Sequence, residues 1–396
     1  MLPKSIRTTD MNPFIVSGKI PESCFCDRVE ETKQLVGNLT NGRNTVLTSE
    51  RRVGKTGLIE HCFNNPAIHS AYYTFFVDIL RTSSLQEFVY QFGSTLFETL
   101  KPLSRKMMDL FVQTVRSVSG EIGYDPATNL PKFSFSIGAL RNPEYTLEEI
   151  FRYISLADRH CIIAFDEFQQ IVRYPQKNIE AVLRTHIQHC TNATFIYAGS
   201  ERHILSEMFN SYSRPFYAST SMMSLDVLKK DVYVDFSRRL FHEADKDISE
   251  DAVETVYDLF EGNTYCMQRT LNIAFEHTAP DGLCTKDTVR SAVKTILTEQ
   301  DHSYRMRLSL LTPKPKELLF AIAKDGHAQH LTSGNFVRRH HLTSSSSVQS
   351  AVKQLLAEDW ITYTVTENDR IYKLSDDFLR LWIVENYGIT DLRNRL

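Results

Sequence analysis

The sequence predicts an α/β fold, a parallel β-sheet with helices on both faces, followed by a helical region and a C-terminal winged helix. Three observations predict it. Apolar segments that suit buried strands alternate with helical patterns from residue 44 to about residue 228, which is typical of a parallel sheet. A loop with a phosphate-binding pattern follows the first of these strands. The last predicted elements come in the order helix, helix, helix, strand, strand, as in a helix-turn-helix with a β wing.

The chain length sets the expected organisation. With 396 residues, the chain can form two or three domains with cores of their own. We expect an α/β domain at residues 1–228, which an insertion of helix and β-hairpin interrupts at 83–145. A helical lid follows at 229–307, and a winged-helix domain at 308–396.

Composition excludes several classes of protein. Apolar residues make up 42% and charged residues 23%, which is ordinary for a soluble globular protein. The net charge of −3 gives no general attraction to nucleic acid. The seven cysteines are scattered without a CxxC pair, which is typical of a reduced, cytoplasmic protein. No apolar run approaches the ~20 residues of a membrane span, and the first residues lack the apolar core of a signal peptide, so we expect no membrane contact.

Residues 49–56 (SERRVGKT) carry the most specific motif. They match the P-loop pattern GxxxxGK[ST] except that Ser49 replaces the first glycine. In this pattern backbone N–H groups and a helix N-terminus bind phosphates, the lysine reaches the β and γ oxygens, and the threonine hydroxyl binds Mg²⁺. An apolar strand before the loop and an amphipathic helix after it fit that geometry, whereas an ordinary surface turn does not require them. The expected nucleotide contacts are Ser49, Arg51, Arg52, Val53, Gly54, Lys55, Thr56 and Gly57.

Two further apolar strands end in polar side chains. The strand at 160–167 ends in Asp166 and Glu167, and the carboxyl ends of central parallel strands face the ligand crevice. We expect Asp166 to hold Mg²⁺ with Thr56, and Glu167 to activate water. An adjacent glutamate favours an ATPase over a small-molecule kinase. The alternative is a strand exit with two solvated acids.

The strand at 193–200 ends in Ser200, a candidate for contact with the γ-phosphate or the attacking water, unless Gly199 and Ser200 only form a turn. The catalytic candidates are therefore Glu167, Lys55 and Ser200.

The remaining elements are read from periodicity. Besides the sheet strands already described, segments 72–78 and 221–225 suit strands. Residues 87–118 have a helical pattern, and residues 119–138 suit a hairpin, to which we assign no chemistry. Residues 229–307 look entirely helical, and Pro313 and Pro315 mark a break. The winged helix is expected to comprise helices 317–323, 333–341 and 344–359 and strands 361–365 and 371–374.

Together these motifs resemble the archaeal-type ATPases of the broader AAA+/STAND P-loop group. The resemblance spans about residues 12–385 and rests on segments 27–31, 49–58, 163–168 and 372–382. It implies a five-stranded sheet in which the Ser200 strand separates the Asp166 strand from the P-loop strand. It also implies that the lead-in, the residues up to about 40 that include Arg28, lies near the adenine. One departure concerns the lid, where Thr264 and Tyr265 stand in place of the proline and arginine of relatives.

We therefore expect an ATP-binding, Mg²⁺-dependent ATPase that hydrolyses ATP to ADP and phosphate and acts as a molecular switch. The alternative is a non-hydrolysing nucleotide-binding scaffold whose winged helix binds protein only. The winged helix contacts either DNA or a protein partner. For DNA, the candidate contacts are Arg338, Arg339, Ser346, Gln349 and Lys353, which lie on or near the outer face of the third helix.

Overall fold

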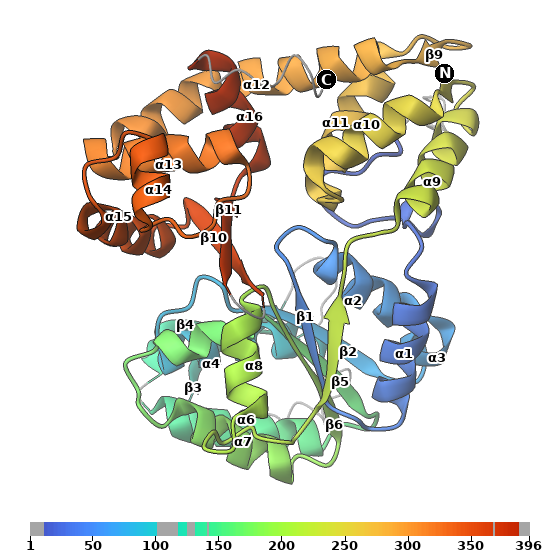
Figure 1. The fold of residues 1–396 in the computed structure, drawn as a ribbon. Coiled ribbons are helices and arrows are strands. Elements are labelled where there is room, and N and C mark those ends of the chain that lie inside the picture. The colour runs from blue at the N-terminus through green and yellow to red at the C-terminus, as the bar shows by residue number, and fades with distance from the viewer. Residues whose placement is uncertain (1–11, 101–117, 125–130, 141, 367–368, 388–396) are drawn as a thin grey trace. The chain divides into compact units, whose positions relative to one another are not determined.

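The computed structural model describes residues 12–100, 118–124, 131–140, 142–366 and 369–387. The chain divides into two compact units. One unit runs from Lys19 to Leu228. The other combines residues 12–18 with the part of the chain that begins at Lys229. Figure 1 shows the ribbon of the whole chain with both units.

A parallel sheet forms the centre of the first unit. Its five strands in the described residues lie in the order β2 (Tyr73–Asp78), β5 (Cys161–Asp166), β6 (Ala193–Gly199), β1 (Thr45–Ser49) and β7 (Ser221–Leu225). All four neighbouring pairs are parallel. Strand β6 separates β5 from β1, so the predicted fold class and strand order are confirmed.

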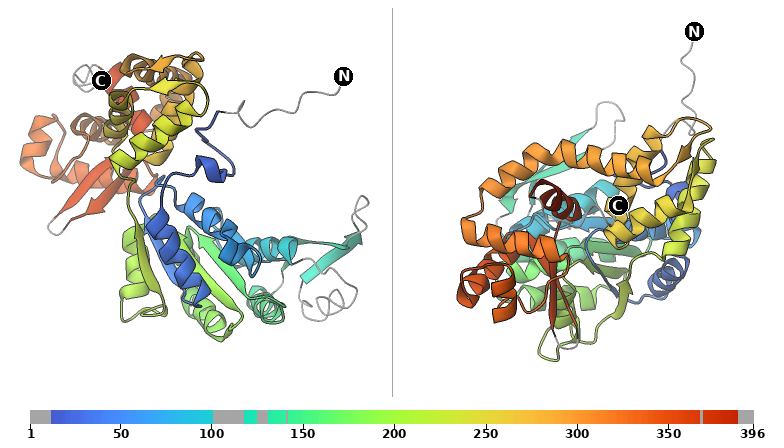
Figure 2. Two further views of the ribbon diagram at one scale, coloured as in Figure 1. Left: turned by 90° about the vertical axis from the view of Figure 1, so that its right-hand side faces the viewer. Right: turned by 45° about the horizontal axis from the view of Figure 1, so that its top comes forward.

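Helices cover both faces of this sheet, as Figure 2 shows from the side. One face packs on α1 (Val29–Thr40), α2 (Lys55–Asn64) and α3 (Pro66–His69). The other packs on α4 (Leu85–Thr99), α6 (Pro143–Ser155), α7 (Ile179–His189) and α8 (Arg202–Asn210). Strand β5 is buried at every position. This explains its unbroken apolar sequence, because successive side chains enter opposite cores.

The insertion forms the predicted hairpin. Strands β3 (Val118–Tyr124) and β4 (Pro131–Leu140) pair antiparallel. Residues 125–130 in the middle of the expected hairpin lie outside the described residues, as does the stretch 101–117 of the predicted helical segment. Two 3₁₀ turns complete this unit, η2 (Glu22–Cys24) in the lead-in and η3 (Phe168–Arg173) directly after β5.

The lid part of the second unit contains α9 (Lys230–His242), α10 (Glu250–Phe260), α11 (Thr264–His277) and the long helix α12 (Lys286–Ser309). The expectation of an entirely helical segment was wrong in one respect. Strands β8 (Asp247–Ile248) and β9 (Leu283–Cys284) pair in parallel. Ile248 and Cys284 are buried, and pairing two interhelical connections satisfies backbone groups that would otherwise lose water without a partner.

The winged helix follows with α13 (Pro313–Asp325), α14 (Gly334–Arg339), α15 (Ser345–Ala357), β10 (Ile361–Val365) and β11 (Arg370–Leu374). The predicted break at the prolines is the start of α13, where proline is favoured because the first N–H groups of a helix have no partner within it. A final helix, α16 (Asp377–Asn386), was not predicted as an element. Its Trp382 is buried, and the indole N–H donates to Asp301 Oδ1 on α12 at 3.0 Å.

Side-chain contacts, in addition to the chain connection, join the lid to the winged helix. Asn263 Nδ2 donates to Asp377 Oδ2 at 2.9 Å, and the rings of Phe260 and Phe378 lie 5.0 Å apart. Residues 12–18 also belong to this unit. The fully buried ring of Phe14 packs beside Phe241 and Phe275 on lid helices α9 and α11.

None of the described helices combines the length and the apolar character needed to cross a lipid bilayer.

Candidate active site

The phosphate loop joins the end of β1 to the start of α2. Its backbone turns through the left-handed region at Arg52 (φ 68°) and Gly54 (φ 94°), and helix α2 begins at Lys55. A side chain at Gly54 would strain the backbone, since only glycine enters this region without cost. Ser49 is not among the described residues with positive φ, so the missing first glycine places no strain on the loop. Its hydroxyl donates to the carbonyl of Glu50 at 2.8 Å.

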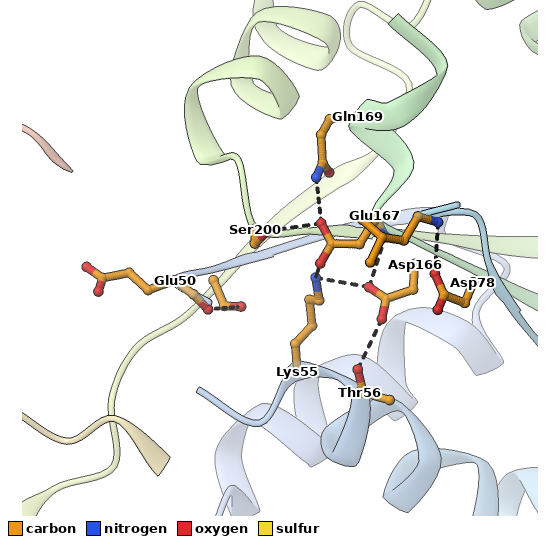
Figure 3. A network of polar contacts seen from close by, with 10 residues as sticks. Glu50, Lys55, Thr56, Asp78, Asp166, Glu167, Gln169 and Ser200 are labelled. Atoms are coloured by element: carbon orange, nitrogen blue, oxygen red, sulfur yellow. Dashed lines mark hydrogen bonds and ion pairs between the residues drawn. The ribbon is translucent and has the colours of Figure 1, made fainter. Parts of the chain in front are cut away.

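The side chains of Lys55 and Thr56, the last two residues of the loop motif, reach the end of β5. Lys55 Nζ lies 2.9 Å from Asp166 Oδ1 and 3.2 Å from Glu167 Oε1. The Thr56 hydroxyl donates to Asp166 Oδ2 at 3.0 Å. Figure 3 shows the ammonium between the two carboxylates. Lys55 and Asp166 are each 7% exposed, so their charges interact in a poorly hydrated environment, where such interactions are strong.

Glu167 is held on both of its oxygens. Oε1 faces Lys55, whereas Oε2 accepts hydrogen bonds from Gln169 Nε2 at 2.5 Å and from the Ser200 hydroxyl at 3.0 Å. Figure 3 shows both donors pointing at this carboxylate. Burial raises the pKa of Glu167, but the nearby Lys55 ammonium and the hydrogen bonds outweigh burial, so its pKa is lowered. The side chain is therefore an anion at neutral pH, as a proton acceptor must be.

The sequence matches a family model described as an ATPase domain predominantly from Archaea over residues 25–269, and a probable winged helix domain over residues 302–385. The first match covers more than half of the chain. The chain belongs to this ATPase family. No protein with a curated function matches the sequence.

Two solved structures share the fold of this family member. The Walker-type ATPase PABY2304 of Pyrococcus abyssi has 20% identity and a TM-score of 0.60, with 94% of this chain and 99% of that chain covered. The ORC2 protein of Aeropyrum pernix, in its ADPNP–ADP complexes, has 13% identity and a TM-score of 0.57, with 96% of this chain and 99% of that chain covered.

The lead-in of the ATPase domain supports the loop. Arg28, which the resemblance placed near the adenine, is 5% exposed, and its guanidinium donates to Val53 O at 3.2 Å and to Glu31 Oε1 at 2.8 Å. The first contact joins Arg28 to the loop backbone and the second joins it to α1, and a direct contact with nucleotide stays a prediction. The ring of Phe25 stacks on His61 of α2 with centroids 4.1 Å apart.

The structure brings together Lys55, Thr56, Asp166, Glu167 and Ser200, as the motifs predicted from three separate segments. Gln169 was not among the predicted site residues. Its place two positions beyond the acidic pair predicts little, because its contact with Glu167 depends on the 3₁₀ turn of η3. The side chains of Arg51 and Arg52 are exposed on the loop, and Val53 is buried beneath it.

The winged helix of this ATPase carries a groove of about 840 Å³ between α15 and the wing. It is lined by Gln349 and Lys353, which were predicted, and by His330 and Arg370, which were not. Ser346, Arg338 and Arg339 are exposed but do not line this groove. Arg339 forms an ion pair with Asp325 and lies over the ring of Phe336, so its charge is already partly compensated.

Proposed function

We propose that this protein binds ATP with Mg²⁺ and hydrolyses it to ADP and phosphate, and that the nucleotide state acts as a switch. The observation that carries the proposal is the convergence of Lys55 and Thr56 of the loop on Asp166 and Glu167 of β5. Membership of the ATPase family and the nucleotide complexes named for the Aeropyrum pernix protein support it. The finer AAA+/STAND grouping is part of the same proposal.

The oxygen donors fit a magnesium ion. Thr56 Oγ1 and Asp166 Oδ2 lie 3.0 Å apart, and hydroxyl and carboxylate oxygens are the ligands that Mg²⁺ prefers. In the described part of the chain no group of three or more His, Cys, Asp or Glu side chains could hold a metal alone. This suits Mg²⁺, which usually keeps several waters and takes further oxygens from the substrate phosphates. Mg²⁺ would neutralise charge on the β- and γ-phosphates.

The residues of the chain then have separate roles. Backbone N–H groups of the loop and Lys55 hold the phosphates, and this draws the ammonium away from the two carboxylates. Glu167 accepts a proton from water while the water oxygen bonds to the γ-phosphorus. The bond from that phosphorus to the β,γ-bridging oxygen breaks, and ADP leaves with the electron pair. Ser200 follows the neighbouring strand β6, where it can sense the γ-phosphate through its hydrogen bond to Glu167.

The test compares ATP binding and phosphate release for the unaltered protein and Lys55→Ala. We expect Lys55→Ala to lose phosphate release and to bind ATP much more weakly. Lys33→Ala removes an exposed lysine from α1 and serves as the matched control. Tight ATP binding without any release would instead favour the non-hydrolysing scaffold.

For the winged helix we propose contact with DNA through the groove beside α15. Lys353 and Arg370 supply positive charge there and Gln349 supplies a side-chain amide, which are groups that bind phosphates and base edges. Asp369 also lines the groove and pairs with His330 at 3.1 Å, so the charge is mixed. A partner protein with an acidic segment is the alternative occupant.

Fluorescence anisotropy with duplex DNA at several salt concentrations separates these possibilities. The proposal predicts binding that weakens with salt and is lost in a Lys353→Ala/Arg370→Ala double variant. A matched control, Lys316→Ala/Lys324→Ala on α13, should bind as the unaltered protein does. Absence of DNA binding at low salt would turn the search to a protein partner.

We also propose a cytoplasmic location. None of the seven cysteines forms a disulfide in the described part of the chain, as expected in a reducing compartment.

A further inference from the structure

Gln169 is a buried amide whose position neither the loop nor the strand motif explains. It lies on η3, directly after β5, and is 2% exposed. Its Nε2 donates to Glu167 Oε2 at 2.5 Å. Burying a long polar side chain is unfavourable unless its polar atoms find partners. Gln169 Oε1 has none within the described residues, so half of the amide is buried at a cost. The contact that offsets this cost is made by the amide nitrogen, which donates to the carboxylate of Glu167.

Gly199 makes room for this amide. A Cβ added at position 199 would lie 2.0 Å from Gln169 Oε1, far inside van der Waals contact, and 2.8 Å from Leu205 Cδ1, the movable end of a side chain on α8. Gly199 does not belong to the described glycines with positive φ, so its backbone conformation is open to any residue. Glycine at position 199 therefore matters for the room it leaves to neighbouring side chains, and not for an unusual backbone conformation. Glycine at the end of β6 and glutamine after β5 form one arrangement around Glu167.

We propose that Gln169 is a positioning residue, which together with Ser200 fixes Oε2 of Glu167 and so directs Oε1 toward the reacting water. The proposal rests on the proposed ATPase function. Oε2 is held by two neutral donors, whereas Oε1 contacts the ammonium of Lys55 at 3.2 Å. Phosphate groups compete more strongly for that ammonium than for the two neutral donors, because hydrogen bonds between charged groups are the stronger ones. When Lys55 turns to phosphate, Oε1 becomes the acceptor left for water, and Oε2 remains anchored.

The first test replaces Gln169 with methionine, which has a similar length but no hydrogen-bond donor. We expect kcat for phosphate release to fall by about 10²-fold, the loss typical of a misplaced catalytic group, while KM and ATP affinity stay within about twofold. Gln170→Met is the matched control, because the side-chain amide of the adjacent Gln170 donates to Thr82 O at 3.0 Å and not to the carboxylate of Glu167. This control should keep the kcat of the unaltered protein.

A second test uses Gly199. In the unaltered chain Gly199→Ala should displace the Gln169 amide and lower kcat as Gln169→Met does. In a Gln169→Ala background only the 2.8 Å contact with Leu205 Cδ1 remains, and it involves the end of a flexible side chain, so the same change at Gly199 should lower kcat much less. Equal losses from Gly199→Ala in both backgrounds would overturn the proposal.

The outcomes separate this inference from the proposed function. If the unaltered protein releases no phosphate, the proposed function fails. If it does, and Lys55→Ala abolishes release, then an unchanged kcat in Gln169→Met overturns only the role of Gln169. A Gln169→Met variant that loses ATP affinity and melting temperature in parallel with kcat also overturns it, because the residue would then be structural. A fall in kcat alone supports positioning.

Discussion

At the scale of the residue, the site depends on one cation and two adjacent carboxylates. Lys55 is within 3.2 Å of both, and Thr56 contacts the Asp166 oxygen that Lys55 does not. The proximity of these four residues could be predicted, because loop and strand motifs specify residue types at fixed spacing, and their roles stay predictions. Gln169 could not be predicted, since its contact with Glu167 depends on the turn of η3 and on the space beside Gly199.

Thr56→Val removes one hydroxyl and keeps the branched shape of the side chain. If Thr56 binds Mg²⁺, ATP affinity in excess Mg²⁺ should fall by about tenfold or more, as expected for the loss of at least ~1.4 kcal/mol. In EDTA the unaltered protein and the variant should bind ATP equally. Isothermal titration under both conditions measures this. An equal loss of affinity with and without Mg²⁺ would contradict a role in metal binding.

At the scale of the element, continuous apolar runs predicted the sheet well, because strands buried on both faces tolerate few polar residues. Their order in space came from the family resemblance, since periodicity alone says nothing of which strands are neighbours. The β8–β9 pair was missed because two-residue strands have no periodicity to detect. Helix α16 was missed as an element because its sequence was read only as the ending of the winged helix.

His160, which precedes β5, makes the first unit sensitive to acid. Its Nε2 lies 2.8 Å from Thr194 Oγ1, and burial lowers its pKa from 6.5. Below pH 6.5 the unfolded chain therefore takes up a proton that the folded chain resists, and stability falls as the pH falls. His160→Gln keeps a side chain able to bond Thr194 but does not titrate.

Calorimetric melting at pH 7.5 and pH 5.5 tests this. The melting temperature of the unit with the sheet should fall less in His160→Gln than in the unaltered protein. Equal falls in both would show that His160 does not contribute.

Asn263 connects lid to winged helix at the start of α11. Its Oδ1 caps the helix by accepting from Cys266 N at 3.2 Å, and its Nδ2 donates to Asp377, whose pKa is raised chiefly by burial. Asn263→Ser keeps a capping oxygen but loses the contact with Asp377, which should cost about 1.5–3 kcal/mol. Asn263→Ala loses the cap as well, for about 1 kcal/mol more.

Tryptophan fluorescence during urea unfolding measures these losses selectively. Both tryptophans of the chain, Trp360 and Trp382, belong to the unit of lid and winged helix. An Asn263→Ser variant as stable as the unaltered protein would contradict a stabilising contact between lid and winged helix.

At the scale of the whole molecule, the division into three domains at residues 228 and 307 stays a prediction. By contacts the chain forms two compact units, and the lid and the winged helix lie in the same one. Residues 12–18 join that unit through Phe14. The chain therefore passes between the units twice, after Gly18 and after Leu228. Sequence patterns did not predict the first passage, because a short apolar segment does not specify which core it enters.

Hydrolysis in the proposed function depends on Glu167 as the proton acceptor, so replacing this residue is the decisive experiment. Phosphate release is followed at saturating ATP and Mg²⁺ for the unaltered protein and for Glu167→Gln, with bound ATP quantified in both. We predict that Glu167→Gln binds ATP but releases phosphate about 10²- to 10⁴-fold more slowly, the range expected for loss of a general base. Equal rates of release in the two proteins would contradict the account.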